Sequence, residues 1–452
     1  MALPRAGGPP PPGSVPKKLI AASVFGNTIE FYDFAVYGLM TALVFDKVFF
    51  PAADPAVGTV LAFAAFAVGF LSRPLGGAVF GHLGDRFGRK PMLLWSLGIM
   101  GGATFLMGLL PSYAAVGIWA PVLLTVLRFC QGLGLGGEWG GAVSLVIESA
   151  PPHRRGWYGS LVQTGSGLGI ILSSLTLTAL LAGLTTEQLL AWGWRLPFLV
   201  SILLVGVGLV IRQRIEESPE FERLRDQGAP VRAPLRETVR RHGKSIGLAI
   251  GMHTAIAAFG FLLGVYVIAY LVDQLQLSRS TATTINVVSA VFYLAGMLLS
   301  GRLCDRVGRR RVYLACGLLL IPTPFLLFAL LDTRSLPVVF TACCLANFVN
   351  GLPYGVQASL FCELFPASVR YSGISLGFQI ATVLGGALAP TVAALLLRAS
   401  GGRSWPIAAY VSVLAVAMVA CTAAARGIHP RTESHAVPPG PLPVPHRPPS
   451  QP

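Results

Sequence analysis

Long apolar runs recur along almost the whole chain, and they limit the folds open to it more than any other feature. They extend from Leu19 to Arg426. An α-helix rises 1.5 Å per residue, so about 20 residues are enough to cross a hydrocarbon core about 30 Å thick. Hydrophobic residues make up 54% of the 452 residues and charged residues only 12%. This composition excludes an ordinary soluble domain and predicts an all-α membrane protein.

Twelve of these runs are long enough to span a bilayer, so we expect twelve transmembrane helices. The first should remain in the mature protein, because a Pro/Gly-rich stretch leads straight into an apolar run that already carries acidic residues, unlike a cleavable signal. The expected spans are 19–45, 56–82, 91–111, 115–148, 157–183, 193–213, 245–272, 281–302, 311–331, 337–362, 371–397 and 405–426.

Basic residues alternate with this topology. The net charge of +15 would favour a nucleic-acid partner only if Lys and Arg gathered on one soluble face. With the N-terminus placed in the cytoplasm, most of them fall on that side, as the positive-inside rule requires. We therefore expect a multi-pass protein of the cell (inner) membrane, surrounded by lipid, with both termini cytoplasmic and no nucleic-acid partner. The exceptions are Arg73 and Arg128 within spans and, outside, Lys47, Arg195, Arg279, Arg334, Arg398 and Arg403.

The seven cysteines lie in or beside apolar spans, with no CxxC pattern and no His at metal-ligand spacing. This placement is typical of small packing residues. We expect no disulfide, no metal and no cofactor.

The polar loop after the second span is repeated after the eighth. Residues 81–90 read GHLGDRFGRK and residues 301–310 read GRLCDRVGRR. A second pattern, E-x-x-P-x-x-x-R, begins at Glu148 after span 4 and at Glu363 after span 10. Two motifs in the same order predict a duplicated six-helix unit and hence two pseudo-symmetric halves.

The expected domains follow from this duplication. The stretch between the halves is too polar to insert, and both chain ends are Pro-rich without apolar periodicity, which is typical of disorder. The expected segments are a disordered tail 1–16, an N-terminal six-helix bundle 17–214, a cytoplasmic linker 215–244, a C-terminal six-helix bundle 245–426 and a disordered tail 427–452.

The duplicated G-x-L-x-D-R-x-G-R-[KR] loop and the twelve spans resemble the major facilitator superfamily. Finer patterns are similar to its metabolite:proton symporter branch. Residues 26–37 carry G-N-x-x-E-x-x-D-F-x-x-Y, residues 128–141 carry R-x-x-Q-G and then G-E-W-G-G, and Glu217-Ser218-Pro219 follows span 6. The resemblance implies the major facilitator fold and a secondary transporter that moves a small carboxylate-bearing metabolite inward with H⁺, using the proton gradient. We also expect a monomer.

The resemblance leaves several functions open. Members of this branch carry shikimate, 2-oxoglutarate, citrate, and proline or betaine. The sequence of spans 2 to 6, and of the stretch from Arg370 onward, most resembles the shikimate-like members. The main alternative is an osmoregulatory proline or betaine symporter, although such carriers often end in a coiled coil and this tail has no heptads. A drug/proton antiporter usually has Gly-Pro in span 5, where this chain reads Gly165-Ser-Gly167. We expect no enzyme, because the loops are short and lack a catalytic set.

A polar stripe in span 1 predicts a proton site. Gly26, Glu30, Asp33 and Tyr37 fall at i, i+4, i+7 and i+11, on one face of a helix. Glu30 lies about 18 Å beyond Lys18 along the helix, near mid-membrane. Two acids one turn apart in a low-dielectric site cannot both ionise cheaply. The alternative is permanent pairing of these acids with buried arginines.

Charges in spans 2 and 4 complete the candidate central site. Arg128 lies near mid-depth, and its fixed charge and forked donors suit a carboxylate. Glu138 follows a glycine run and is expected to act as a second proton site or gate partner, the alternative being a buried hydrogen bond. Arg73 is expected to contact either solute or the span-1 acids. The expected proton-coupling residues are Glu30, Asp33 and Glu138, and the expected solute-binding residues are Arg128, Arg73, Gln131, Tyr37, Asn347 and Gln379.

Polar residues of the second half are weaker candidates, because interhelical hydrogen bonds are their more frequent use. They are His253, Asn286, Asn347, Asn350, Tyr354 and Gln379.

The duplicated loops predict a gate. Their glycines allow a tight turn between helices, and each Asp can pair with a nearby Arg or with a facing helix end when the gate closes. Simple anchoring of the spans by basic residues is the alternative, but it does not explain the recurrent Asp. The expected gating residues are Asp85, Arg86, Arg89, Glu148, Arg155, Asp305, Arg306, Arg309, Glu363 and Arg370.

Overall fold

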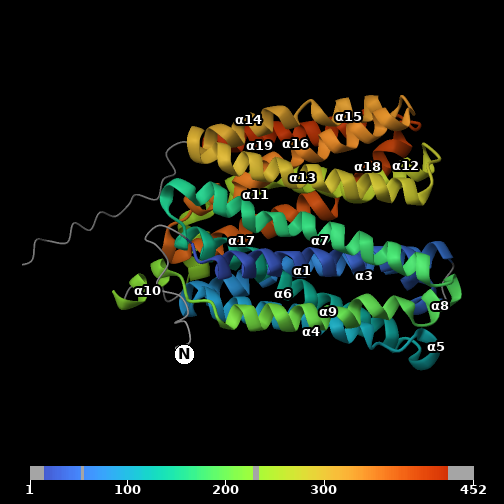
Figure 1. Cartoon of the computed structure of the whole chain (residues 1–452), viewed down its shortest axis with the longest axis horizontal. Helices are drawn as coiled ribbons and strands as arrows, with labels where there is room; N and C mark the ends of the chain where they lie inside the picture. Colours follow the sequence, from blue (N-terminus) through green and yellow to red (C-terminus); the bar gives the residue numbers. More distant parts are fainter. Residues whose placement is uncertain (1–14, 52–54, 228–233, 426–452) are drawn as a thin grey trace, which may run out of the picture.

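The computed structural model describes residues 15–51, 55–227 and 234–425, and every regular element in these ranges is helical. The expected tails lie outside the described residues, except for Val15 and Pro16 at the margin of the first. The long helices run roughly parallel to one another, so the molecule is a bundle about one membrane span deep (Figure 1).

The first half contains six long helical passages. The first combines α1 (Lys17–Met40), a π-helical turn (Thr41–Phe45) and α2 (Asp46–Phe49). The others are α3 (Pro55–Phe87), α4 (Arg89–Gly108), α6 (Trp119–Ser149), α7 (Arg155–Gly183) and α9 (Leu196–Gln213), with the short α5 (Tyr113–Val116) and α8 (Thr186–Ala191) between them.

The second half repeats this order. Its first passage combines α11 (Pro234–Phe261), a π-helical turn (Leu262–Tyr266) and α12 (Val267–Asp273). Then follow α13 (Arg279–Val307), α14 (Arg309–Leu320) with α15 (Thr323–Leu331), and α16 (Leu336–Glu363). The last two passages are α17 (Arg370–Ala381) with a π-helical turn (Thr382–Ala387) and α18 (Ala389–Ala399), and α19 (Trp405–Ala424).

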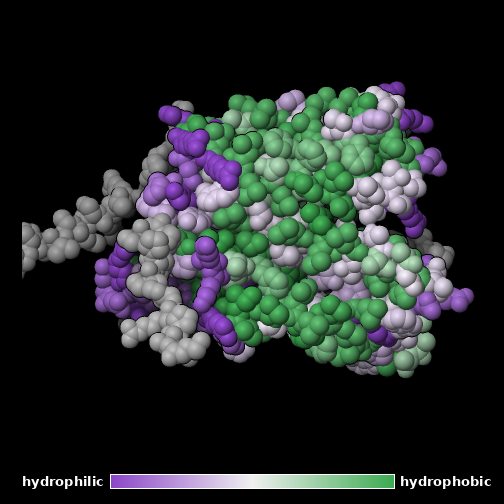
Figure 2. Space-filling view, viewed as in Figure 1, coloured by the Kyte–Doolittle hydropathy of each residue, from purple (hydrophilic) through white to green (hydrophobic). Residues whose placement is uncertain are grey.

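On the face shown in Figure 2, an apolar belt lies between two polar ends. Among the described residues, eleven helices are long and apolar enough to cross a membrane. The passage from Lys17 to Phe49 is not one of these eleven, because Glu30 and Asp33 lower its hydropathy. This passage, the first along the chain, brings the number of described helical passages to twelve. It packs against α7, α9 and α6 in the first half.

The two halves meet along two related helix pairs. The α3 helix packs against α17, and α13 packs against α7. The first glycine of each duplicated loop explains the close approach: a Cβ on Gly81 would lie 2.7 Å from Ser372 Cα, and a Cβ on Gly301 would meet the side chain of Ser160. Glycine therefore lets the halves touch at matching places.

The duplicated loops form tight turns at the end of the bundle where α1 begins. Gly88 and Gly308 have φ values of 112° and 103°, which favour glycine, and each immediately precedes the next helix. We call this end the basic end; it also carries α10 (Pro219–Asp226) and lies at the left of Figure 1.

The segment between the halves is partly helical. The sequence predicts a linker over 215–244, but α10 occupies part of it and α11 already begins at Pro234, with a kink at His242. Residues 228–233 lie outside the described residues.

Candidate functional site

Two buried acids lie on α1 without a cationic partner in contact. Glu30 and Asp33 are each 1% exposed. Among the described residues, neither has a Lys or Arg nitrogen within 4.0 Å, and Glu30 Oε2 and Asp33 Oδ1 have no hydrogen-bond partner. Buried polar atoms are normally satisfied, so these two oxygens are places for a proton, a water molecule or a solute group.

Asp33 is connected to Arg128 by a chain of side chains. Thr104 Oγ1 donates to Asp33 Oδ2 over 2.9 Å, and Gln131 Nε2 donates to Thr104 Oγ1 over 2.7 Å. Arg128 Nη1 in turn donates to Gln131 Oε1. The acid of α1 and the cation of α6 therefore communicate through α4 rather than by direct contact.

Arg128 is enclosed by aromatic rings of the first half. Its guanidinium carbon lies 4.0 Å from the ring centroid of Tyr37, 4.8 Å from Phe66 and 5.0 Å from Phe34. Such contacts stabilise a cation where water is excluded. Among the described residues, Nε and Nη2 of Arg128 have no hydrogen-bond partner, so two of its nitrogens have unpaired donors.

Arg73 lies between the halves. Its guanidinium stacks on Phe34 and Phe70, with distances of 4.6 and 5.3 Å to the ring centroids. Its charge interacts with Glu30 and with the hydroxyl of Tyr354, which comes from α16 of the second half. Among the described residues, Arg73 Nε has no hydrogen-bond partner. Glu30, Arg73 and Tyr354 therefore form the polar centre of the molecule.

Aromatic side chains close this centre on both sides. Away from the basic end, Phe261 of the second half packs edge-on against Phe34 and Phe70, with centroids 5.8 and 5.4 Å apart. Towards the basic end, Phe378 is stacked between Trp139 at 3.9 Å and His253 at 4.3 Å. Both clusters join residues of the two halves, so aromatic contacts cross the interface on either side of the centre.

The Trp139 cluster is also tied by amide groups. Trp139 Nε1 donates to Gln163 Oε1 over 2.8 Å, and Gln163 Nε2 donates to Tyr354 O over 3.2 Å. His253 Nδ1 lies 3.0 Å from Gln357 Oε1. Of these three contacts, the hydrogen bond from Gln163 to Tyr354 O crosses the interface of the halves.

Glu138 forms a buried ion pair with Arg212. Arg212 Nη1 contacts Glu138 Oε2 at 2.8 Å and Leu93 O at 2.8 Å, and its Nη2 contacts Glu138 Oε1. Ser96 Oγ adds a hydrogen bond to Glu138 Oε2 at 3.1 Å. A fully bonded carboxylate fits the buried-bond alternative for Glu138 better than a proton carrier. Arg212 lies near the end of the expected span 193–213, in the last turn of α9, and is 2% exposed.

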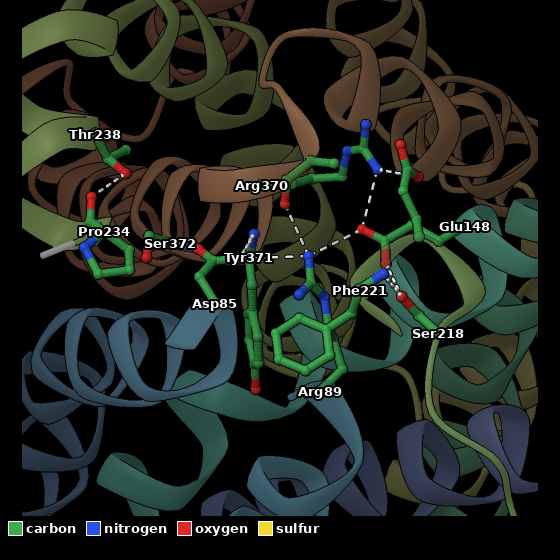
Figure 3. A network of polar contacts seen from close by, with 12 residues as sticks. Asp85, Arg89, Glu148, Ser218, Phe221, Pro234, Thr238, Arg370, Tyr371 and Ser372 are labelled. Carbon is green, nitrogen blue, oxygen red and sulfur yellow. Dashed lines mark hydrogen bonds and ion pairs between the residues drawn. The ribbon is translucent and has the colours of Figure 1, made fainter. Parts of the chain in front are cut away.

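At the basic end, Asp85 caps a helix of the opposite half (Figure 3). Its Oδ1 accepts from the backbone N–H of Tyr371 over 3.1 Å and its Oδ2 from that of Ser372 over 2.8 Å. These N–H groups belong to the first turn of α17, which has no intrahelical acceptors for them and carries partial positive charge.

Asp305 makes the matching contact. Its two oxygens accept from the backbone N–H groups of Gly156 and Trp157, each over 2.8 Å, in the first turn of α7. Each half therefore caps a helix of the other.

Arginines reinforce the same contacts. Arg89 Nη2 lies 3.2 Å from Glu148 Oε1 and donates to Ala367 O over 2.8 Å. Its counterpart Arg309 contacts Glu363 and donates to Pro152 O over 2.7 Å. Both arginines thus join an acid of their own half to a turn of the other half.

One additional cross-link involves the segment between the halves. Arg370 Nη1 lies 3.0 Å from Glu148 Oε1 and 2.9 Å from Glu220 Oε2 of α10, and Ser218 donates to Glu148 (Figure 3). Glu217 accepts from the backbone N–H groups of Arg89 and Lys90 over 3.0 and 3.1 Å. The segment between the halves is therefore part of the closed basic end.

Three expected gating residues do not join this network. Arg86 and Arg306 are exposed, because their positions on α3 and α13 point away from the opposite half. Arg86 stacks on Phe87 at 5.0 Å. Arg155 donates to Ala150 O over 3.3 Å. The acid of its own motif, Glu148, is bonded to Arg89 and Arg370 instead, and the acid of the second motif, Glu363, to Arg309.

The two expected C-terminal solute ligands lie in different places. Gln379 reaches across the interface, where its Nε2 donates to Leu135 O and Gly136 O over 3.3 and 3.2 Å. Asn347 instead donates to Cys343 O and lines a small cavity between α12, α13 and α16, within the second half. The next turn of α16 places Asn350, whose Oδ1 lacks a partner, in a buried position.

Sequence reasoning missed Thr104, Arg212, Gln163 and the bonds of Glu217, Ser218 and Glu220. A hydroxyl or amide in an apolar span gives no strong signal, because such groups usually bond within their own helix. Arg212 ends an apolar run and is followed by other basic residues.

Two facing six-helix halves, with buried charges between them and a closed polar network at one end, define a multi-pass membrane transporter. Residues 19–239 match the family model of sugar (and other) transporters, and residues 248–451 match that of the Major Facilitator Superfamily. The chain is 41% identical over 399 residues to the shikimate transporter of Escherichia coli K12, covering 87% of this chain and 91% of that protein.

Further relatives agree. The chain is 35% identical over 410 residues to the proline/betaine transporter of Escherichia coli K12, covering 88% and 81% of the two chains. The fold is similar to that of the proton:xylose symporter XylE, with a TM-score of 0.70 at 18% identity over 90% of this chain and 94% of that one. The chain belongs to the major facilitator superfamily, in its metabolite:proton symporter branch. The predicted fold class, the family and the expectation of a transporter rather than an enzyme are thereby confirmed.

Proposed function

We propose that this protein takes up a small carboxylate-bearing metabolite together with H⁺ by alternating access. The observation that carries the proposal is the presence of two buried acids, Glu30 and Asp33, near Arg73 and Arg128 without direct ion pairs. Intramembrane charges are costly and usually functional. Acids fixed by salt bridges would hold helices together, whereas acids with free oxygens remain open to protonation.

The charges explain why a proton and an anion would travel together. With Asp33 ionised, the positive charge of Arg128 is balanced within the first half. Protonation removes that balance, and a solute carboxylate restores it, because an uncompensated buried charge is unfavourable. The same argument applies to Glu30 and Arg73. Tyr354 and Gln379 supply polar contacts from the second half, and the proton gradient supplies the energy without a cofactor.

We place the basic end in the cytoplasm, since positive charge favours that side of the membrane, and we propose that one chain is the transport unit. Asp85, Asp305 and their arginine partners then form the cytoplasmic gate. Closed, the gate lets the centre communicate only with the outside, and rocking of one half against the other reverses this access.

Asp305→Asn should loosen this gate. An amide offers only one acceptor oxygen to the two N–H groups of α7, and loss of a helix cap costs about 1 kcal/mol, a shift of about fivefold towards the open gate. Cys304 is a native reporter, because it is 1% exposed and lies against Gly156 of α7. We expect N-ethylmaleimide to label Cys304 about five times faster in the variant, measured by peptide mass spectrometry. Cys343, which lies inside the second half, is the control; equal labelling of Cys304 in both proteins would contradict the gate.

Uptake into proteoliposomes tests the transport proposal. An imposed inward pH gradient should drive accumulation of at least one acid from a panel that includes shikimate, 2-oxoglutarate and citrate, and a protonophore should collapse it. No accumulation of any acid, or accumulation that persists with protonophore, would show that proton-coupled uptake of these acids is wrong.

A proline or betaine carrier is the second candidate, and the relatives at 35% identity favour it. Both solutes carry a carboxylate for Arg73 and a cationic nitrogen for Glu30. Including them in the panel separates the two candidates: selective uptake of betaine or proline would replace the organic-acid proposal.

A further inference from the structure

The hydroxyl of Thr104 has one hydrogen but two acceptors within hydrogen-bond distance. Its oxygen lies 2.9 Å from Asp33 Oδ2, 2.9 Å from Met100 O and 2.7 Å from Gln131 Nε2. All three side chains are almost fully buried, with exposures of 1% for Thr104, 1% for Asp33 and 0% for Gln131. A hydroxyl has one hydrogen and two acceptor positions. The Gln131 amide occupies one acceptor position, which leaves the hydrogen to choose between Asp33 and Met100.

This choice follows the protonation state of Asp33. When the carboxylate is ionised it only accepts, so the Thr104 hydrogen points to Oδ2. When Oδ2 carries the proton it donates to the remaining acceptor position of Thr104, and the Thr104 hydrogen turns to Met100 O. The Thr104 hydroxyl, Gln131 Nε2 and Asp33 Oδ2 stay bonded in both states, and no heavy atom has to move.

The rotation of the Thr104 hydrogen changes the polarity of the hydrogen-bond chain that ends at Arg128. With Asp33 ionised, all donors between Arg128, Gln131, Thr104 and Asp33 point the same way, from cation to anion, and such a chain polarises cooperatively. Rotation towards Met100 reverses its last link, so the chain no longer leads from Arg128 to an anion. The charged or titratable groups that interact with Asp33 are Arg128 on α6 and Tyr32 on α1, while Tyr37 on α1 and Arg73 on α3 act on Arg128.

We propose that Thr104 is a positioning residue that transmits the protonation state of Asp33 through Gln131 to Arg128, and so couples the proton to the solute. This inference rests on the proposed function, because it takes Asp33 as a proton site and Arg128 as an anion site.

The test compares Thr104→Val, which has nearly the same shape without a hydroxyl, with Thr104→Ser, which restores the hydroxyl. Thr125→Val is the matched control, since the Thr125 hydroxyl bonds only to Pro121 O of its own helix. Reconstituted transporters are assayed with radiolabelled shikimate for accumulation under a pH gradient and for counterflow exchange without one. We expect Thr104→Val to lower accumulation at least tenfold and exchange less than twofold, with Thr104→Ser and Thr125→Val within twofold of the unmodified protein.

Unchanged accumulation in Thr104→Val, or an equal loss of accumulation and exchange, would overturn the proposal. If the unmodified protein does not transport shikimate, the unfolding midpoint in detergent decides instead. The effect of Thr104→Val on that midpoint should then vary with pH when Asp33 is present and be constant with pH in an Asp33→Asn background. A constant effect in both backgrounds would overturn the role of Thr104, whereas absence of shikimate uptake alone bears only on the proposed function.

Discussion

Asp33→Asn should abolish gradient-driven accumulation while leaving counterflow exchange. The amide keeps the size of the side chain and can still accept from Thr104, so packing is preserved, but it cannot take up and release a proton. Without that proton, solute movement loses its connection to the gradient, and accumulation should fall to the level of passive equilibration. The measurement is uptake of labelled substrate into proteoliposomes, with and without an inward pH gradient.

Asp226→Asn is a suitable control for this variant, because Asp226 is exposed on α10 and, among the described residues, pairs only with the exposed Arg225. It should accumulate substrate like the unmodified protein. Accumulation in Asp33→Asn at the normal level would remove Asp33 from proton coupling and leave Glu30 and Glu138 as the remaining candidates.

Arg212→Leu should destabilise the folded protein more than any other single change considered above. It leaves the Glu138 carboxylate buried, 1% exposed, with no cation to balance it. Breaking a buried ion pair by removing one partner costs about 3–5 kcal/mol, whereas replacing both partners by apolar residues is often neutral. The double variant Glu138→Leu, Arg212→Leu should therefore recover most of the lost free energy of unfolding, measured by thermal or denaturant unfolding in detergent.

Arg225→Leu provides the comparison with an exposed ion pair, for which a change below about 1 kcal/mol is expected. The double variant also separates two roles of Glu138. If it folds and still accumulates substrate under a pH gradient, the pair is structural. If it folds but only exchanges substrate, Glu138 takes part in proton coupling despite its bond to Arg212.

The membrane passages and the duplicated loops could be predicted from the sequence because each has its own chemical signal. A 20-residue apolar run has few other uses, and an Asp that recurs among basic residues at the end of two apolar runs is not explained by anchoring alone. Asp85 and Asp305 each lie three residues before a tight turn, at Gly88 and at Gly308, and each faces a helix start of the other half.

The contacts inside the bundle were much harder to predict. In a soluble helix, apolar periodicity identifies the buried face, but a transmembrane helix is apolar on all faces, so the sequence does not tell which side meets a partner. Asn347 and Asn350 are one turn apart, yet Asn347 lines the cavity within the second half and Asn350 does not. Arg212 was hidden for a related reason, since a basic residue at the end of an apolar run usually lies at the membrane surface.

The exchange of helix caps between the halves has a consequence for assembly. The first turns of α7 and α17 find their acceptors in Asp305 and Asp85, which belong to the other half. A six-helix half made alone would therefore present an uncapped helix start together with an acid that has no helix to receive it. Two halves produced as separate chains would carry exactly complementary ends, so they should recognise each other in the membrane and reconstitute the transporter without a covalent connection.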